Sequence, residues 1–173
     1  MEKKLKRNLI FKGHILNTYV DDVILDDGKP GTREVIENNG GATIAIKKND
    51  KYLMVRQYRY AQEMEMLEFV AGKIDLGEEP LETVLREAIE ETGYSVKNVR
   101  SLGWAAPSPA FLTEKLYMLV GEVDEYKGQH LDEGEVLNVE EYTLDELKAM
   151  VDKNEIVDAK TLLIIYKLLL EAK

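Results

Sequence analysis

The stretch AGKIDLGEEPLETVLREAIEETGY, residues 71–94, determines how this sequence is interpreted. It carries six glutamates and a single arginine, although like charges within one or two helical turns repel one another. Pro80 suits the first turn of a helix, and Gly93 suits the position just after its end. The stretch therefore predicts a helix over residues 80–92, preceded by a loop that contains glycine.

The expected helix has an apolar side and an acidic side. At about 100° per residue, Glu87, Glu90 and Glu91 fall together on the acidic side. No lysine lies among them, so they either form a solvated acidic surface or hold a cation. Oxygen ligands, with no cysteine and only two histidines in the chain, favour Mg²⁺ or Mn²⁺ and phosphoryl chemistry. The residues expected to face the core are Leu81, Val84, Leu85, Ala88 and Ile89.

The composition of the whole chain limits the class of protein to which it can belong. The 173 residues are 45% hydrophobic, which suits one globular domain with its own core. Basic residues number 23 against 33 acidic ones, and the net charge of −10 argues against binding nucleic acid or an anionic membrane surface. The absence of cysteine excludes disulfides, thiol nucleophiles and cysteine-bound zinc. The first 13 residues lack a signal-peptide pattern, and the apolar run 161–170 is too short to span a bilayer, so a soluble cytoplasmic protein is expected.

Runs rich in β-branched and aromatic residues predict the strands, and capping patterns predict two further helices. Thr143 and Glu146 form a capping box for a helix over residues 144–151. Asp158 is a candidate cap for the final helix. This order of strands and helices predicts an α+β fold or an α/β/α sandwich with a mixed sheet. The expected strands are 15–25, 32–38, 41–48, 51–60, 95–104, 114–124 and 135–142.

The opening stretch resembles the signature of the Nudix hydrolases. That signature reads Gly, five residues, Glu, seven residues, Arg-Glu, an apolar residue, any residue, Glu-Glu, any residue, Gly and an apolar residue. Every fixed position is filled at the right spacing, so the chain is identified as a member of this family. The matching residues are Gly72, Glu78, Arg86, Glu87, Ala88, Glu90, Glu91, Gly93 and Tyr94.

The resemblance implies a Nudix fold whose loop–helix–loop motif holds two or three divalent ions, Mg²⁺ or alternatively Mn²⁺. The backbone carbonyl of Ala71 and the carboxylates of Glu87 and Glu91 would be metal ligands. Glu90 would be a further ligand, either directly or through water, and is counted among the catalytic residues.

Other residues of the signature are expected to shape the site. Arg86 and Glu78 resemble the pair that braces the loop against the helix, and Arg86 is also counted as catalytic. Gly72 and Gly93 are expected to serve the local structure of the motif.

A second acidic segment, HLDEGEV, occupies residues 130–136. A glutamate that binds a metal is a poor general base, because the cation lowers its basicity. An attacking water still needs a group that accepts its proton. By resemblance, Glu133 is the candidate base and Glu135 a further metal ligand, although these two roles are open to exchange. Taken alone, the segment reads as an acidic loop without chemistry.

The segments around the signature resemble the ADP-ribose pyrophosphatase branch of the family. Arg59, in VRQYRYA, occupies the position at which that branch grips a substrate phosphate. Pro109 lies sixteen residues after Gly93, in a context typical of ADP-sugar pyrophosphatases. Arg33 is a further candidate for substrate binding. Taken singly, Arg59 would be a surface arginine and Pro109 a residue that shapes a loop.

The branch implies hydrolysis of a nucleoside diphosphate sugar, with ADP-ribose giving AMP and ribose 5-phosphate. Another nucleotide sugar, such as GDP-mannose, is one alternative, and a non-catalytic Nudix domain that senses a ligand is another. The resemblance also implies a homodimer, to which strands within about residues 1–40 of the single domain 1–173 contribute. No nucleic-acid or membrane partner is expected.

Overall fold

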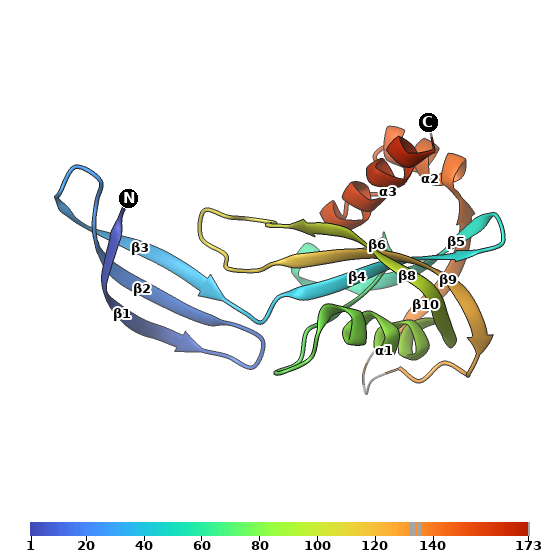
Figure 1. Ribbon diagram of the computed structural model, residues 1–173, viewed down its shortest axis with the longest axis horizontal. Helices are drawn as coiled ribbons and strands as arrows, with labels where there is room; N and C mark the ends of the chain where they lie inside the picture. The colour runs from blue at the N-terminus through green and yellow to red at the C-terminus, as the bar shows by residue number, and fades with distance from the viewer. Residues whose placement is uncertain (132–133, 135, 173) are drawn as a thin grey trace. The chain divides into compact units, whose positions relative to one another are not determined.

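The computed structural model describes all but four positions of the chain, and the residues form two compact units (Figure 1). The first unit consists of Met1–Gly40 and Ala106–Lys115, and the second of Gly41–Ala105 and Leu116–Lys173. No helix in the described part of the chain is long and apolar enough to cross a membrane. The described residues are 1–131, 134 and 136–172.

The first unit is built on a three-stranded antiparallel sheet in the order β1-β2-β3. The segment Ala106–Lys115 joins it through two hydrogen bonds, from the Ile36 amide to the Phe111 carbonyl (2.7 Å) and from the Thr113 amide to the Ile36 carbonyl (2.9 Å). β1 is not among the strands predicted from the sequence, because its basic residues obscure the alternation of a half-buried strand. The strands are β1 (Lys3–Lys12), β2 (Asn17–Ile24) and β3 (Pro30–Glu37).

Arg7 links all three strands of this sheet. Its guanidinium donates hydrogen bonds to Asp21 on β2 (Nε to Oδ1, 2.9 Å) and to Glu37 on β3 (Nη1 to Oε1, 2.9 Å). It also lies 4.5 Å from the centre of the Tyr19 ring. The hydrogen bond from Arg7 lowers the pKa of Asp21, a buried carboxylate that needs such a partner.

The second unit contains a seven-stranded mixed sheet in the order β10-β5-β4-β9-β8, with β6 beside β5 and β7 beside β4. β4 and β9 pair in parallel, and the other neighbouring strands are antiparallel. β6 and β7 are too short for the sequence pattern to separate, and they are missing from the predicted strands. The strands are β4 (Gly41–Lys48), β5 (Lys51–Arg59), β6 (Met64–Glu68), β7 (Val70–Lys73), β8 (Tyr94–Ala105), β9 (Leu116–Tyr126) and β10 (Leu137–Thr143).

Helices cover both faces of this sheet, as Figure 1 shows. α1 (Pro80–Thr92) packs on one face, where Val84 belongs to one hydrophobic core. α2 (Leu144–Asp152) and α3 (Ala159–Glu171) pack on the other face, where Ile165 belongs to a second core. This arrangement confirms the predicted α+β fold, an α/β/α sandwich around a mixed sheet.

α1 begins and ends where the sequence predicts. Glu79 and Glu82 form a capping box at its start, and Gly93 ends it with a left-handed φ of 77°. The prediction of its buried face is partly wrong, because Leu81 is 46% exposed and Glu91 is only 2% exposed. Two threonines take part in the buried face, since their hydroxyls donate hydrogen bonds within the motif. The buried residues of α1 are Thr83, Val84, Ala88, Glu91 and Thr92.

Candidate functional site

The strand that precedes α1 brings its backbone against one of the glutamates. β7 pairs antiparallel with β4, and Gly72 lies opposite Ala42 in that pairing. A Cβ atom at Gly72 would overlap Oε1 and Cδ of Glu87. The carboxylate of Glu87 therefore lies directly against the β7 backbone, in space that exists only because residue 72 is glycine. Ala71, whose carbonyl is a candidate ligand, is the preceding residue of the same strand.

Arg86 binds groups at four positions around it, in β7, in the loop and in α1. Its Nη1 donates to Oε1 of Glu87 (2.7 Å) and to Oε2 of Glu90 (2.9 Å). Its Nε and Nη2 each lie 3.2 Å from an oxygen of Glu78, and Nη2 also donates to the Lys73 carbonyl (3.4 Å). The hydrogen bond with Glu78, followed by that with Glu87, raises the pKa of Arg86. In return, Arg86 lowers the pKa of Glu78 to about 2.

The carboxylates around Arg86 are largely withdrawn from solvent. The side chains of Glu87 and Glu90 are 15% and 29% exposed, and Glu91 is buried. Glu91 is therefore not part of a solvated acidic face, and Glu87 and Glu90 are only partly open to water. The three carboxylates of Glu78, Glu87 and Glu90 share a partly buried region with one arginine, and the region carries an excess of negative charge.

The donor set of this cluster fits a divalent cation. Glu87 and Glu90 already share one positively charged group, the Nη1 end of Arg86, and hard cations prefer such carboxylate oxygens. Within residues 1–131, 134 and 136–172, no three acidic or histidine side chains form a preassembled metal site. The guanidinium lies between two of the candidate ligands. Because Arg86 also holds Glu78, a cation that took the place of Nη1 would leave Arg86 attached to the loop.

Arg59 lies at the end of β5 and is held by the carboxylate of Glu68. Its Nε and Nη2 donate to the two oxygens of Glu68, at 2.6 and 2.7 Å. Lys160 of α3 binds Oε2 of the same carboxylate. The charge of Glu91 contributes to raising the pKa of Arg59, although the hydrogen bond with Glu68 contributes most. Glu91 of α1 is thus one of the charges that act on Arg59, after that of Glu68.

A model of the NUDIX domain family matches residues 38–162 of this chain. The chain belongs to the Nudix family. It is 38% identical to the ADP-ribose pyrophosphatase of Bacillus subtilis over 92% of this chain and 88% of that protein. The methanol dehydrogenase activator of Bacillus methanolicus is also 38% identical, over 98% of this chain and 94% of the relative. The GDP-mannose pyrophosphatase of Pectobacterium atrosepticum is 35% identical, over 95% of this chain and 90% of the relative.

The fold of this Nudix protein has a counterpart among solved structures. The crystal structure of an ADP compounds hydrolase matches it with a TM-score of 0.87, covering 96% of this chain and 91% of that chain. The two sequences are 20% identical, so this likeness shows the fold alone.

The other site residues predicted for the Nudix protein lie in different parts of the chain. Arg33 and Pro109 belong to the first unit, whereas Arg59 and the signature glutamates belong to the second. Arg33 donates to Glu2, with Nε 2.9 Å from Oε2, and Pro109 is exposed. Glu133 and Glu135, the candidates for the base and a further ligand, lie outside the described residues.

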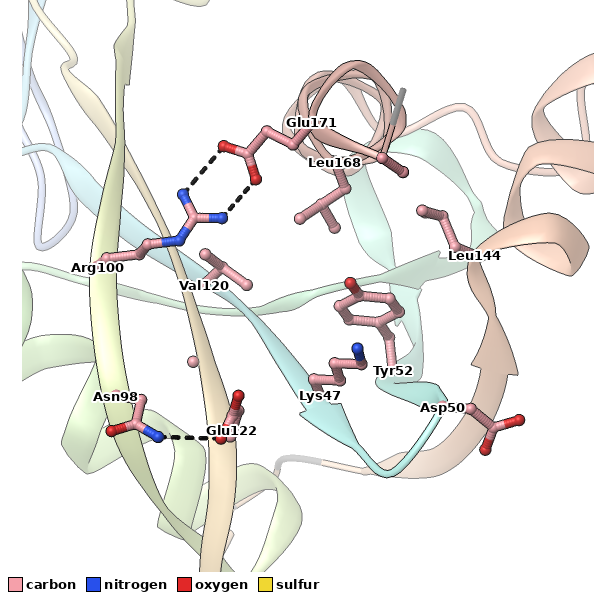
Figure 2. A pocket seen from close by; sticks show the side chains of 12 residues that line it. Lys47, Asp50, Tyr52, Asn98, Arg100, Val120, Glu122, Leu144, Leu168 and Glu171 are labelled. Carbon is pink, nitrogen blue, oxygen red and sulfur yellow. Dashed lines mark hydrogen bonds and ion pairs between the residues drawn. The ribbon is translucent and has the colours of Figure 1, made fainter.

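A cavity of about 400 Å³ in the second unit does not include any residue of the Nudix signature (Figure 2). It is bordered by Arg100, whose guanidinium binds Glu171 near the end of α3, and by Asn98, which donates to Glu122 (3.0 Å). The Tyr52 ring also lines it. Since none of these residues comes from α1 or the loop before it, the candidate site is not this cavity.

Proposed function

We propose that this Nudix protein is a metal-dependent hydrolase that cleaves the diphosphate of a nucleoside diphosphate sugar, with ADP-ribose giving AMP and ribose 5-phosphate. The proposal rests on the acidic cluster of α1, in which Glu87 and Glu90 share one cationic nitrogen and Glu91 is buried. A diphosphate is itself anionic, so it approaches such a cluster only when cations neutralise both. The similarity to an ADP-ribose pyrophosphatase supports ADP-ribose as the substrate.

The proposed cofactor is Mg²⁺, with Mn²⁺ as a substitute, in two or three positions. Glu87, Glu91 and the Ala71 carbonyl would hold the ions, with Glu90 as a further or water-linked ligand and Glu135 as an additional one. When bound, such ions neutralise charge on the phosphate oxygens and make water a stronger nucleophile at neutral pH.

The remaining chemistry belongs to side chains of the chain itself. Arg86 attaches the loop to α1 through its hydrogen bond with Glu78. It also orients Glu90 by a hydrogen bond. Arg59 offers the guanidinium edge that Glu68 leaves uncovered to a substrate phosphate. Glu133 is the proposed base, which accepts the proton of the attacking water.

A panel of nucleotide sugars tests the proposal. ADP-ribose should be hydrolysed fastest in Mg²⁺, with AMP and ribose 5-phosphate formed in equal amounts, and EDTA should abolish the reaction. Initial rates and product identification by anion-exchange chromatography provide the measurement. Undiminished turnover after exhaustive chelation, or no hydrolysis of any nucleotide sugar, would contradict the proposal.

GDP-mannose is the second candidate substrate, because a GDP-mannose pyrophosphatase is 35% identical over 95% of this chain. The same carboxylates would serve it, since the diphosphate is common to both substrates. The discriminating quantity is the ratio of kcat/KM values for ADP-ribose and GDP-mannose. A ratio that favours GDP-mannose would replace ADP-ribose while leaving the metal-dependent chemistry in place.

A homodimer that uses residues 1–40 is also part of the proposal, with Arg33 and Pro109 assisting substrate binding. Apolar side chains of β1 support it, because Leu9, Ile10 and Phe11 are all more than half exposed. Light scattering of the full chain should give twice the mass of one chain, and Phe11→Glu should lower it. A cytoplasmic location is proposed as well, consistent with the absence of cysteine.

A further inference from the structure

Glu68 is a buried charged residue that the proposed chemistry does not itself use. It ends β6 and is 1% exposed. Burial acts to raise its pKa, but the hydrogen bond from Arg59 and the charge of Lys160 outweigh burial and lower the pKa instead. Glu68 is therefore an ionised carboxylate inside the protein, which requires specific partners.

One partner of Glu68 is close to it in the sequence and the other is far away. Arg59, at the end of β5, covers both carboxylate oxygens with Nε and Nη2. Lys160, in the first turn of α3, binds Oε2 and also lies 2.9 Å from Asp158. The next residue of the helix, Thr161, accepts a hydrogen bond from the Phe69 amide (3.0 Å). The start of α3 is thus fixed to the end of β6 at two consecutive positions.

The same contacts leave part of Arg59 available. Its side chain is 39% exposed, although that of Glu68 is 1% exposed. Nη1 makes no hydrogen bond within the described part of the chain, so the Nη1–Nη2 edge of the guanidinium faces away from Glu68. That edge can still donate two parallel hydrogen bonds to a phosphate.

We propose that Glu68 is a positioning residue for Arg59, and that Lys160 supports it from α3, so that the Nη1–Nη2 edge of Arg59 is held ready for a substrate phosphate. This inference rests on the proposed function, in which Arg59 binds phosphate. A long side chain held in one rotamer before binding loses less conformational entropy when the ligand arrives. Glu68 therefore improves affinity without touching the substrate.

A matched arginine–glutamate pair in the same strand provides the control. Arg56, also on β5, donates to Glu140 of β10 through Nε (2.6 Å) and Nη2 (3.1 Å). The geometry repeats that of Arg59 and Glu68. No site residue is involved, so Glu140→Gln removes a comparable ion pair without changing Arg59.

Steady-state kinetics with ADP-ribose separate positioning from general loss of structure. Glu68→Gln and Lys160→Met should raise KM, by about tenfold for Glu68→Gln, and leave kcat within about twofold. Glu140→Gln should leave both constants near the wild-type values. In an Arg59→Met background, Glu68→Gln should raise KM no further, because the residue that it positions is gone. Partial unfolding would instead lower apparent kcat and leave KM unchanged.

Binding of inorganic pyrophosphate, measured by calorimetry with Ca²⁺, provides a readout that does not depend on turnover. The dissociation constant should rise for Glu68→Gln and stay unchanged for Glu140→Gln. The inference is wrong if Glu68→Gln and Glu140→Gln give equal constants, if the effects of Glu68→Gln and Arg59→Met multiply, or if pyrophosphate does not bind. If the wild type hydrolyses no nucleotide sugar, the proposed function fails, and the pyrophosphate constants still decide the role of Glu68.

Discussion

Two charged clusters of the second unit differ in their balance of positive and negative charge. On α1 and its loop, Arg86 binds Glu78, Glu87 and Glu90, which leaves a formal charge of 1 − 3 = −2, and the buried Glu91 lies on the same helix. At the start of α3, Arg59 and Lys160 face Glu68 and Asp158, and the formal charges cancel.

The difference indicates what each cluster does. Crowded carboxylates without enough cations destabilise a fold, so their presence points to a ligand that completes the charge. A balanced buried cluster needs no ligand, and it fixes the geometry of the groups that it contains. We therefore propose metal binding for the α1 cluster and orientation of Arg59 for the Glu68 cluster.

Glu91→Gln should have the largest effect on activity. The change keeps the shape of the side chain but removes one charge from a site that must hold divalent ions. We expect kcat to fall by about 10³-fold, on the scale of several kcal/mol of lost charge stabilisation, and to recover partly at high Mg²⁺ concentration. The measurement is kcat against Mg²⁺ concentration, with Glu140→Gln as the control. An activity loss that is indifferent to Mg²⁺ would place Glu91 outside the metal site.

Lys160→Met should have the largest effect on stability. It leaves the buried Glu68 with Arg59 as its remaining cationic partner, and losing one hydrogen bond to a buried charged group costs about 1.5–3 kcal/mol. Glu140→Gln breaks a more exposed pair and should cost about 1 kcal/mol or less. Urea denaturation compares the two free energies of unfolding. Equal losses would show that the Glu68 cluster has no special place in the fold.

Gly72→Ala should lower activity by about 10²-fold with little loss of stability. The added Cβ would overlap the end of a flexible side chain, so Glu87 moves away from β7 while the backbone stays in place. Gly77→Ala is the matched control, because that glycine has a φ of 89° and open space around it. Gly77→Ala should lower the free energy of unfolding by about 1 kcal/mol and leave kcat unchanged. Full activity of Gly72→Ala would contradict the placement of Glu87.

Glu78 should make stability depend on acid pH. Its pKa is lowered to about 2 from an ordinary 4.5, so the stability it contributes is complete above pH 4.5 and disappears as pH falls toward 2. Glu78→Gln should flatten the pH dependence of the unfolding free energy in this window by up to about 1.4 kcal/mol per pH unit. Denaturation at several pH values measures the slope. Parallel curves for the two proteins would mean that Arg86 does not hold Glu78 as described.

Local signals in the sequence were sufficient to predict the bounds of α1. Pro80, Gly93 and the spacing of the glutamates act within a few residues of one another, and the helix bounds follow from them. The burial of Glu91 was not predictable in this way, because it depends on which face of α1 meets the sheet. The order of strands and helices indicated the fold class, and the resemblance to the Nudix signature agreed with it.

The Glu68 cluster could not be predicted from the sequence. Glu68 and Lys160 are 92 residues apart, and no local spacing in the sequence pairs one with the other. A lone glutamate within the apolar run MLEFV was the one available signal, because a charge in such a run needs a buried partner. The partner, Lys160, comes close to Glu68 only because α3 packs on the sheet.

Direct measurement of metal binding tests the contrast between the clusters most closely. Mn²⁺ titrated into the wild type and followed by electron paramagnetic resonance should bind, and Glu87→Gln should bind it more weakly by about tenfold or more. Glu68→Gln should bind Mn²⁺ as the wild type does, because its cluster is already balanced. Equal Mn²⁺ affinity in the wild type and Glu87→Gln, or a loss confined to Glu68→Gln, would contradict the assignment of the metal site to α1.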